Sequence, residues 1–229
     1  LAGFAGDFVV ATAGPALESV LAGKGAGAES YSRAHSCAVL NLDIGGGTTI
    51  LALFEYGILR DTGCLNVGGR LVKVDTDGCL TYLSPVLQPF FDFTVGQRMS
   101  EVLLEPVAQL LTEVLEEAVG LRAPTGLLEQ FVTDKNVALQ KMPLLSFSGG
   151  VADLITPEAR EPFAYGDLGV LLGRAIYRSR LCEGTFLRAQ ETIRATVIGA
   201  GSHATTLSGS TIFYDGVAFP MKNLPVAAL

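Results

Sequence analysis

Residues Cys37 to Thr49 read CAVLNLDIGGGTT, an apolar run that ends in one acid, three glycines and two threonines. A run of this length and composition is typical of a buried strand. The glycines after it allow a tight turn and let backbone N–H groups approach an anion. The stretch therefore predicts a strand and a phosphate-binding loop, whose candidate contacts are Gly45, Gly46, Gly47, Thr48 and Thr49.

Asp43 stands at the end of this predicted strand, just before the glycines. A carboxylate repels a bare phosphate, so an acid here makes chemical sense when a divalent cation lies between the two groups. We therefore interpret Asp43 as a partner of Mg²⁺, with water between the carboxylate and the ion.

The glycines alone are a weak signal, because three glycines after a strand are also compatible with a flexible turn. Residues 50–54 resume an apolar strand, a Glu55-Tyr56-Gly57 turn follows, and a further strand begins at Ile58, so the loop joins paired strands. A Walker A site requires a loop that leads into a helix and a Gly-Lys-Ser/Thr ending. Neither that motif nor a Rossmann fingerprint fits.

The strand, the Asp-Ile-Gly-Gly-Gly-Thr-Thr loop and the returning strand resemble the phosphate loop of the actin, Hsp70 and sugar-kinase ATPase superfamily. Ala13 to Gly23 is similar to the helix that precedes this loop in Hsp70-type domains, and residues 67–70 resemble the Gly-Gly turn after the hairpin. The apolar run at residues 144–148, followed by Gly149 and Gly150, is similar to the superfamily's adenosine motif. The resemblance implies an actin-like (ribonuclease H-like) α/β ATPase fold, with mixed sheets flanked by helices. It also implies ATP or ADP and Mg²⁺ as cofactors, and nucleotide contacts from both glycines.

Other stretches of the sequence resemble one particular family within this superfamily. Residues 61–71, residues 197–203 and residues 208–212 resemble the ethanolamine ammonia-lyase reactivating factors of ethanolamine utilisation. This resemblance spans nearly the whole chain and implies an ATP-dependent, chaperone-like protein that releases damaged cobalamin from its partner, ethanolamine ammonia-lyase. It further implies a weak Mg²⁺-dependent ATPase in the cytoplasm, with association with a bacterial microcompartment as an option.

Two other classes of function stay open. A small-molecule kinase of the same superfamily needs a polar substrate pocket beside the phosphate loop, and the sequence gives no sign of one. A partner-binding scaffold with a vestigial nucleotide site keeps the glycines but binds its partner regardless of nucleotide. The sequence assigns no catalytic residue.

The superfamily has a first phosphate loop near its N-terminus, and nothing before Asp43 resembles it. The chain also begins with Leu1 and reaches a strand-like run at Phe8 to Ala11 almost at once. We therefore expect roughly half of a two-domain ATPase, without its N-terminal phosphate-loop region. We expect residues 1–95 to form the phosphate-loop part and residues 96–229 a second lobe, so that each lobe offers a glycine edge to a nucleotide between them.

The Gly149-Gly150 pair also has a structural explanation, because a helix that packs on a sheet often needs small residues at the crossing. The glycine-rich turn that contains His203 is interpreted in the same way, as a structural hydrogen-bonding segment. The four cysteines are far apart and form no Cys-x-x-Cys pair, which favours free thiols in a reducing cytosol over a zinc site.

Composition fits a globular core, with 49% hydrophobic and 17% charged residues among 229. The mean hydropathy of +0.41 is high, but polar residues, Gly or Pro interrupt every apolar run before it reaches a membrane-spanning length. We interpret the excess as buried sheet and as surfaces for partners or missing parts. The net charge of -7 and the lack of a basic run argue against nucleic acid as a partner.

Periodicity and turn residues predict several further elements. Pro106 is expected to kink or restart the helix predicted at Gln97 to Val119. Residues 123–142 show no clear period. The arginines of the helix predicted at Leu168 to Arg180 are interpreted as part of its solvated face. Contact with a nucleotide base or with an acidic partner is the alternative. The expected elements are a helix at Pro15 to Ala22, a hairpin of Leu71 to Val74 and Cys79 to Leu83, a helix at Gln97 to Val119 stopped by Gly120, and a helix at Leu168 to Arg180 capped by Asp167.

Overall fold

The computed structural model describes residues 15–158, 160–184, 186–188, 192 and 194–199. The strand expected at Phe8 to Ala11 and the turn around His203 lie outside these residues. The helices are α1 (Pro15–Gly25), α2 (Ala28–Ala34), α3 (Glu101–Ala118) and α4 (Gly169–Tyr177). The strands are β1 (Ala38–Ile44), β2 (Thr49–Glu55), β3 (Ile58–Leu65), β4 (Val72–Val74), β5 (Leu80–Leu83), β6 (Leu144–Ser148) and β7 (Leu187–Arg188).

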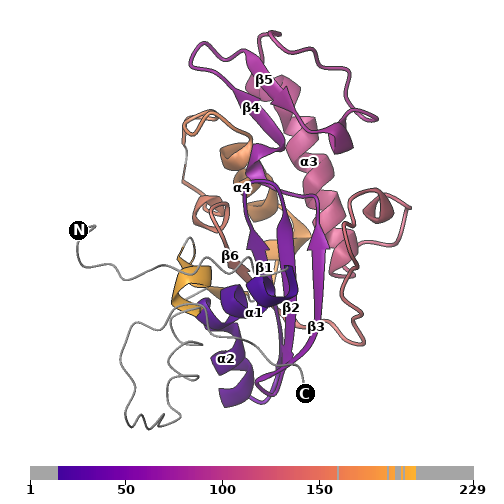
Figure 1. Ribbon diagram of the computed structural model, residues 1–229, viewed down its shortest axis with the longest axis vertical. Helices are drawn as coiled ribbons and strands as arrows, with labels where there is room; N and C mark the ends of the chain where they lie inside the picture. The colour runs from indigo at the N-terminus through magenta and orange to yellow at the C-terminus, as the bar shows by residue number, and fades with distance from the viewer. Residues whose placement is uncertain (1–14, 159, 185, 189–191, 193, 200–229) are drawn as a thin grey trace, which may run out of the picture.

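β1 lies at the centre of a five-stranded mixed sheet with the order β3-β2-β1-β6-β7 (Figure 1). β2 is antiparallel to both β1 and β3, whereas β6 is parallel to both β1 and β7. The side chains of β2 are buried from Thr49 to Phe54, as expected for a strand that is covered on both faces. The strands predicted on both sides of the glycine loop are confirmed.

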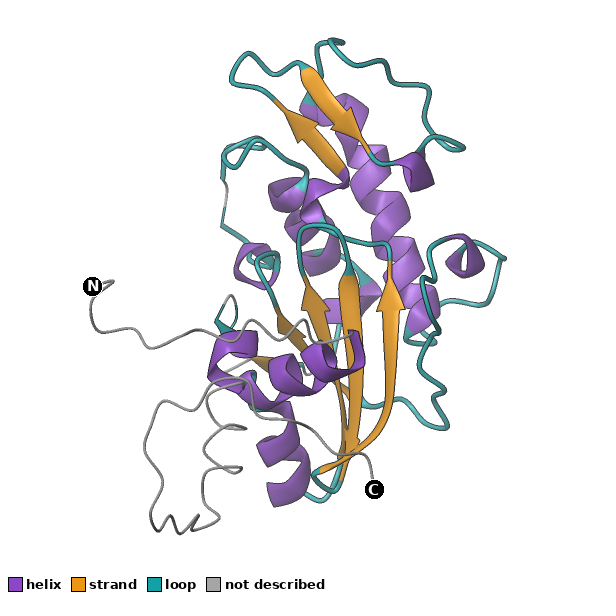
Figure 2. Cartoon of the chain, in the orientation of Figure 1, coloured by secondary structure: helices purple, strands orange, loops and turns teal. Residues whose placement is uncertain are grey.

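Two layers of helices enclose the sheet (Figure 2). Leu40, Leu42 and Ile44 of β1 belong to the main core, to which α3 and α4 also contribute. Val39 of the same strand packs instead in a second cluster with Ala28 of α2. Because side chains alternate along a strand, these two sets lie on opposite faces. The result is the mixed sheet flanked by helices that the sequence predicts.

α3 forms one continuous helix through Pro106, so the restart considered from the sequence does not occur. Proline at this position removes one hydrogen bond, to the carbonyl of Val102 four residues earlier. Val102 is 77% exposed, so water can reach the end of the helix where this bond is missing. Ser100 caps the start by accepting from the Leu103 N–H, and Gly120, with φ of 78°, follows the last turn as predicted.

The predicted hairpin forms a separate two-stranded sheet of β4 and β5, at the top of Figure 1. At its turn, the Asp75 carboxylate accepts hydrogen bonds from the N–H groups of Asp77 and Cys79. The backbone N–H of Val74 in β4 donates to the Gly166 carbonyl at 2.9 Å. The hairpin is therefore attached to the chain just before α4.

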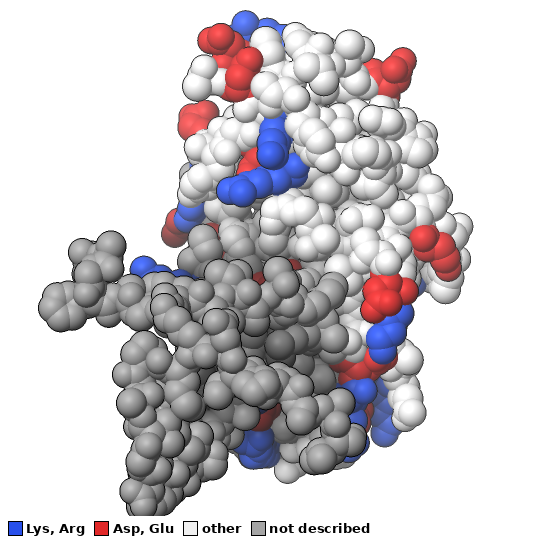
Figure 3. All heavy atoms as spheres, in the orientation of Figure 1, with Lys and Arg blue, Asp and Glu red and all other residues white. Residues whose placement is uncertain are grey.

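Charged side chains form small separate groups of both signs on the described part of the face in Figure 3, with wide uncharged areas between them. In the described part of the chain, no helix has both the length and the apolar character needed to cross a bilayer. The cysteines are free thiols, as expected, and burial raises the pKa of the Cys182 thiol to about 11.

Residues 123–142, which had no clear period in the sequence, form a connection that runs along the outer edge of β3. The N–H of Cys64 donates to the Lys135 carbonyl at 3.0 Å, and the N–H of Asn66 donates to the Phe131 carbonyl at 2.7 Å. The Asp61 carboxylate forms an ion pair with Lys135 and accepts from the Ala138 N–H at 2.9 Å. The connection thus covers an edge strand whose backbone groups would otherwise be unpaired.

Burial of Asp61 works against ionisation, but the Lys135 ammonium and two backbone N–H groups outweigh it and lower the pKa of Asp61 below its ordinary 3.8. Replacing Asp61 with Asn should therefore lower the free energy of unfolding by about 1 kcal/mol at neutral pH. A depressed carboxyl pKa stabilises the fold above the ordinary pKa, and this contribution is lost as the pH falls through the folded value.

Urea unfolding near neutral pH and at about pH 3 tests this prediction, with the gap between wild type and variant closing in acid. Asp134→Asn is the matched control, because Asp134 is exposed and has no ion pair within the described residues. A gap of equal size at both pH values would contradict the assignment.

Candidate functional site

The glycine loop between β1 and β2 is held from two directions. The Gly45 N–H donates to the Thr48 carbonyl at 2.9 Å, which closes the loop on itself. The N–H groups of Gly69 and Arg70 donate to the carbonyls of Gly45 and Gly46, at 3.1 and 2.6 Å. The Gly-Gly turn after β3 therefore packs directly on the predicted phosphate loop.

Gly68 is required by this close approach. A Cβ added at Gly68 would lie 2.4 Å from the Gly46 carbonyl oxygen, which is shorter than real contacts allow. By contrast, a Cβ added at Gly47 would meet nothing within 4 Å. The glycines of this region thus include both structural positions and an exposed one.

Asp43 is fixed by a chain of buried hydrogen bonds. The Ser148 hydroxyl donates to Asp43 Oδ1 at 3.0 Å, and Asn41 Nδ2 donates to the Ser148 hydroxyl at 2.9 Å. Asn41 and Ser148 are both fully buried, and Ser148 lies opposite Asp43 in the parallel register of β1 and β6. Side chains of the sheet therefore orient the carboxylate of Asp43, the candidate metal partner.

Asn41 and Ser148 were not predicted from the sequence as residues that support Asp43. Their signal is the alternation of polar residues at 41 and 43, and again at 146 and 148, within two otherwise apolar strands. Such alternation places the four side chains on one face of the sheet. This alternation indicates a shared polar site only when the two strands are known to be neighbours.

Gly149 turns the chain against the end of β1. It has φ of +85°, and a Cβ added there would lie 2.4 Å from the Ile44 carbonyl oxygen and 2.8 Å from Asp43 Oδ1. The Val151 N–H donates to the same Ile44 carbonyl at 3.1 Å. The predicted adenosine-motif segment is thereby brought next to the phosphate-loop candidate.

A cleft of ≈ 370 Å³ opens between these segments. Its walls are Gly45 and Gly46 of the loop, Gly69 and Arg70, and two stretches at residues 150–154 and 165–169. Of the residues predicted to contact a nucleotide, Gly45, Gly46 and Gly150 line this cleft.

Four other predicted residues lie differently. Gly47 and Thr48 sit at the loop tip and do not line the cleft, and Gly149 contacts the end of β1. Thr49 is fully buried, and its hydroxyl donates to the Val67 carbonyl at 2.8 Å. Thr49 therefore anchors the start of β2. Its enclosed hydroxyl does not face the cleft.

The two glycine segments lie on one sheet. β6, which leads into Gly149, is the immediate parallel neighbour of β1, which leads into Gly45. The carboxyl ends of parallel neighbouring strands meet at the same sheet edge, where α/β proteins commonly bind ligands. The expectation of one glycine edge from each of two lobes stays a prediction; in the described residues, both glycine segments follow neighbouring strands of one sheet.

The charged side chains that line the cleft are Arg70, Asp153 and Asp167, and two of them form an ion pair. Arg70 Nε lies 3.7 Å from Asp167 Oδ2, while Asp167 Oδ1 accepts from the Gly169 N–H at 2.8 Å. Asp167 thus accepts from the first N–H of α4, as expected of a capping side chain, although the N-cap position is Leu168 and the helix ends at Tyr177, before the expected Arg180. Burial raises the pKa of Asp167 despite the opposing Gly169 N–H, Arg70 and Lys73.

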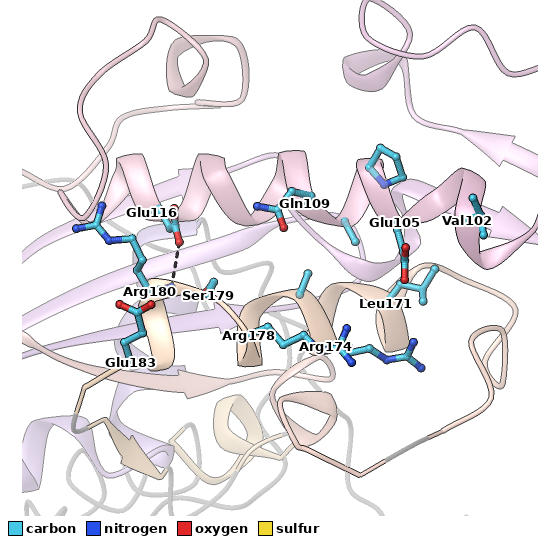
Figure 4. Close-up of a pocket in the computed structure, with 13 residues that line it drawn as sticks. Val102, Glu105, Gln109, Glu116, Leu171, Arg174, Arg178, Ser179, Arg180 and Glu183 are labelled. Carbon is cyan, nitrogen blue, oxygen red and sulfur yellow. Dashed lines mark hydrogen bonds between the residues drawn. The ribbon is translucent and has the colours of Figure 1, made fainter.

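A second cavity, of ≈ 540 Å³, lies between α3 and α4 (Figure 4). Arg174 on its wall pairs with Glu101 and donates to the Arg160 carbonyl at 3.2 Å. Glu116, which is 6% exposed, accepts from the Arg180 N–H at 3.1 Å. Arg174, Arg178 and Arg180 line this second cavity, and none of them lines the glycine cleft.

The described residues contain no cluster of three or more His, Cys, Asp or Glu side chains that could hold a metal ion. Mg²⁺ does not need such a cluster, because it is commonly bound by one or two carboxylates together with substrate phosphates and water. Asp43, at the edge of the glycine loop and oriented by Ser148, fits this donor set.

The family model of "Ethanolamine utilisation protein EutA" matches residues 1–229. Two curated relatives, both named ethanolamine ammonia-lyase reactivase EutA, come from Escherichia coli (strain K12) and Salmonella typhimurium (strain LT2). Each is 42% identical over 236 residues, which cover 97% of this chain and 49% of the relative. The chain therefore spans about half the length of these relatives. The five-stranded mixed sheet flanked by helices confirms the predicted α/β class.

Solved structures with a similar chain trace include ethanolamine utilization protein EutJ from Carboxydothermus hydrogenoformans and MreB5 of Spiroplasma citri bound to AMPPNP. The EutJ match has a TM-score of 0.39 and 18% identity, and covers 80% of this chain and 52% of that chain. The MreB5 match has a TM-score of 0.41 and 16% identity, and covers 84% of this chain and 59% of that chain.

Replacing Gly149 with Ala should destabilise the protein by roughly 2 kcal/mol or more, because the new Cβ meets a backbone carbonyl in a left-handed conformation. Gly150→Ala is the adjacent control, since a Cβ there meets nothing within 4 Å. Thermal unfolding followed by circular dichroism should show a lower Tm for the first variant only. Equal stability of both variants would show that Gly149 is not held against β1 as described.

Proposed function

The chain belongs to the ethanolamine utilisation protein EutA family, and from this we propose that the intact protein is an ATP-dependent reactivating factor for ethanolamine ammonia-lyase. In this role it releases damaged cobalamin from the lyase, so that intact coenzyme can bind. The two curated relatives are named as ethanolamine ammonia-lyase reactivases, and this chain matches about half of the length of each. The family match supports the partner, and the cleft supports the nucleotide.

The observation that carries the nucleotide part is the meeting of two glycine segments at one sheet edge. Gly45 and Gly46 on one side, and Gly150 on the other, line the same cleft, whereas Asp43, two residues before Gly45 in β1, does not line it. Glycines expose backbone to a ligand without side chains in the way, which suits close approach of phosphate groups. We assign the phosphates to the Gly45–Gly46 side of the cleft and the adenosine to the Gly150 side.

Asp43 would hold Mg²⁺ in this site, through water, when nucleotide is bound. The ion supplies neutralisation of phosphate charge, which together with positioning accounts for most of the catalysis in phosphoryl transfer. Ser148 and Asn41 keep the carboxylate in place and limit its rotation. The hydrolysis we propose is slow, because reactivation needs a change of state and not a high turnover.

The mechanism we propose is conformational. Nucleotide bound at the sheet edge favours one arrangement of the intact protein, and loss of the terminal phosphate favours another. Coupling of this kind is typically about 1–3 kcal/mol, which changes affinity for a partner by one or two orders of magnitude. The affinity that changes here is that for ethanolamine ammonia-lyase.

Asp43→Ala in the intact protein should weaken binding of Mg²⁺-ATP at least tenfold, as measured by titration calorimetry. In the presence of a chelator, wild type and variant should bind ATP equally weakly, because the carboxylate acts through the metal. Asp77→Ala in the exposed hairpin turn is the matched control and should leave affinity unchanged. A metal-independent loss would assign Asp43 a structural role instead.

The second part of the experiment adds inactivated, cobalamin-loaded ethanolamine ammonia-lyase. Recovery of lyase activity that requires ATP and is reduced by Asp43→Ala supports the reactivase. Binding to the lyase that is indifferent to nucleotide would support a scaffold. ATP consumption that depends on a small-molecule acceptor, and not on the lyase, would support a kinase.

A further inference from the structure

Arg70 contacts the glycine loop through its backbone and its stem, while its side chain is largely exposed. Its N–H donates to the Gly46 carbonyl at 2.6 Å, and a Cβ added at Gly46 would lie 3.0 Å from Arg70 Cδ. The Arg70 side chain is nevertheless 70% exposed. The guanidinium can therefore move over the cleft without disturbing the loop.

Arg70 is also the single cationic side chain among the described residues that line the cleft. The same walls carry the carboxylates of Asp153 and Asp167. A nucleotide phosphate entering between two acids meets repulsion from both, so a direct cationic contact is needed in addition to a metal ion. A guanidinium provides several N–H donors in a planar arrangement that matches phosphate oxygens.

Asp167 holds the Arg70 guanidinium only loosely. The Nε to Oδ2 distance of 3.7 Å exceeds hydrogen-bonding length, and the other carboxylate oxygen already accepts from the Gly169 N–H. The Asp167 side chain is 12% exposed and is enclosed by its neighbours, whereas the Arg70 side chain has open solvent around it. Arg70 can therefore exchange Asp167 for another anion by movement of its own side chain alone.

We propose that Arg70 is a direct ligand of the nucleotide phosphates and that Asp167 competes with them for its guanidinium. This inference rests on the proposed nucleotide site. Asp167 thereby sets the affinity for phosphate-bearing ligands and leaves the affinity for the nucleoside part unchanged. Burial raises the pKa of Asp167, and the Gly169 N–H, Arg70 and Lys73 offset this shift only in part.

The test is titration calorimetry of the intact protein with Mg²⁺-ATP, Mg²⁺-ADP and adenosine. Arg70→Met keeps the stem over Gly46 but removes the charge, and should weaken both nucleotides about tenfold. Arg70→Lys should recover part of this loss. Asp167→Asn keeps an oxygen for the Gly169 N–H and should strengthen both nucleotides severalfold. Adenosine should bind all variants like wild type.

Lys73→Met is the control for general electrostatics, because Lys73 lies near Asp167 and does not line the cleft. It should change nucleotide affinity less than twofold. If Arg70→Met binds Mg²⁺-ATP as well as the wild type does, the role of Arg70 is overturned and the proposed function is left intact. Equal weakening of adenosine would show a merely structural role. Wild type that binds no nucleotide would overturn the nucleotide part of the proposed function as well.

Discussion

The parallel pairing of β1 with β6 is the constraint on which the rest of the site depends. It sets Asp43 opposite Ser148, and the turn at Gly149 then folds over the end of β1. These contacts join residues more than a hundred positions apart in the chain. Each of the two glycine segments of the cleft follows one of these paired strands, so the sheet positions groups that no local segment could bring together.

Features encoded by local pattern were predictable from the sequence. The apolar run before the glycines, the returning strand and the Asp77-Gly78 hairpin each follow from short-range periodicity and turn chemistry. Asp167 was also recognisable as a helix cap, because a short acidic side chain before an amphipathic stretch has this role by proximity alone. The family resemblance added the link between the loop and Gly149 that periodicity does not contain.

Features that depend on packing were not predictable. Thr49 has the same residue type as its neighbour Thr48, yet it is enclosed by the core and bonded to the Val67 carbonyl. The pairing of Arg70 with Asp167 requires the chain to return after almost a hundred residues. Pro106 leaves α3 continuous because the carbonyl it deprives of a partner lies on the exposed side. In each case the outcome depends on the surroundings in space and not on sequence distance.

The polar stripe on β1 and β6 also has a consequence for folding. Asn41 and Asp43 alternate with Leu40 and Leu42, which face the main apolar core. If β1 shifted by one residue against its neighbours, every side chain would change face, and an amide and a carboxylate would enter that core. Burying such groups without partners costs several kcal/mol. The residues that orient the candidate metal partner therefore also act as a check on strand alignment, which penalises misregistered intermediates before any ligand is present.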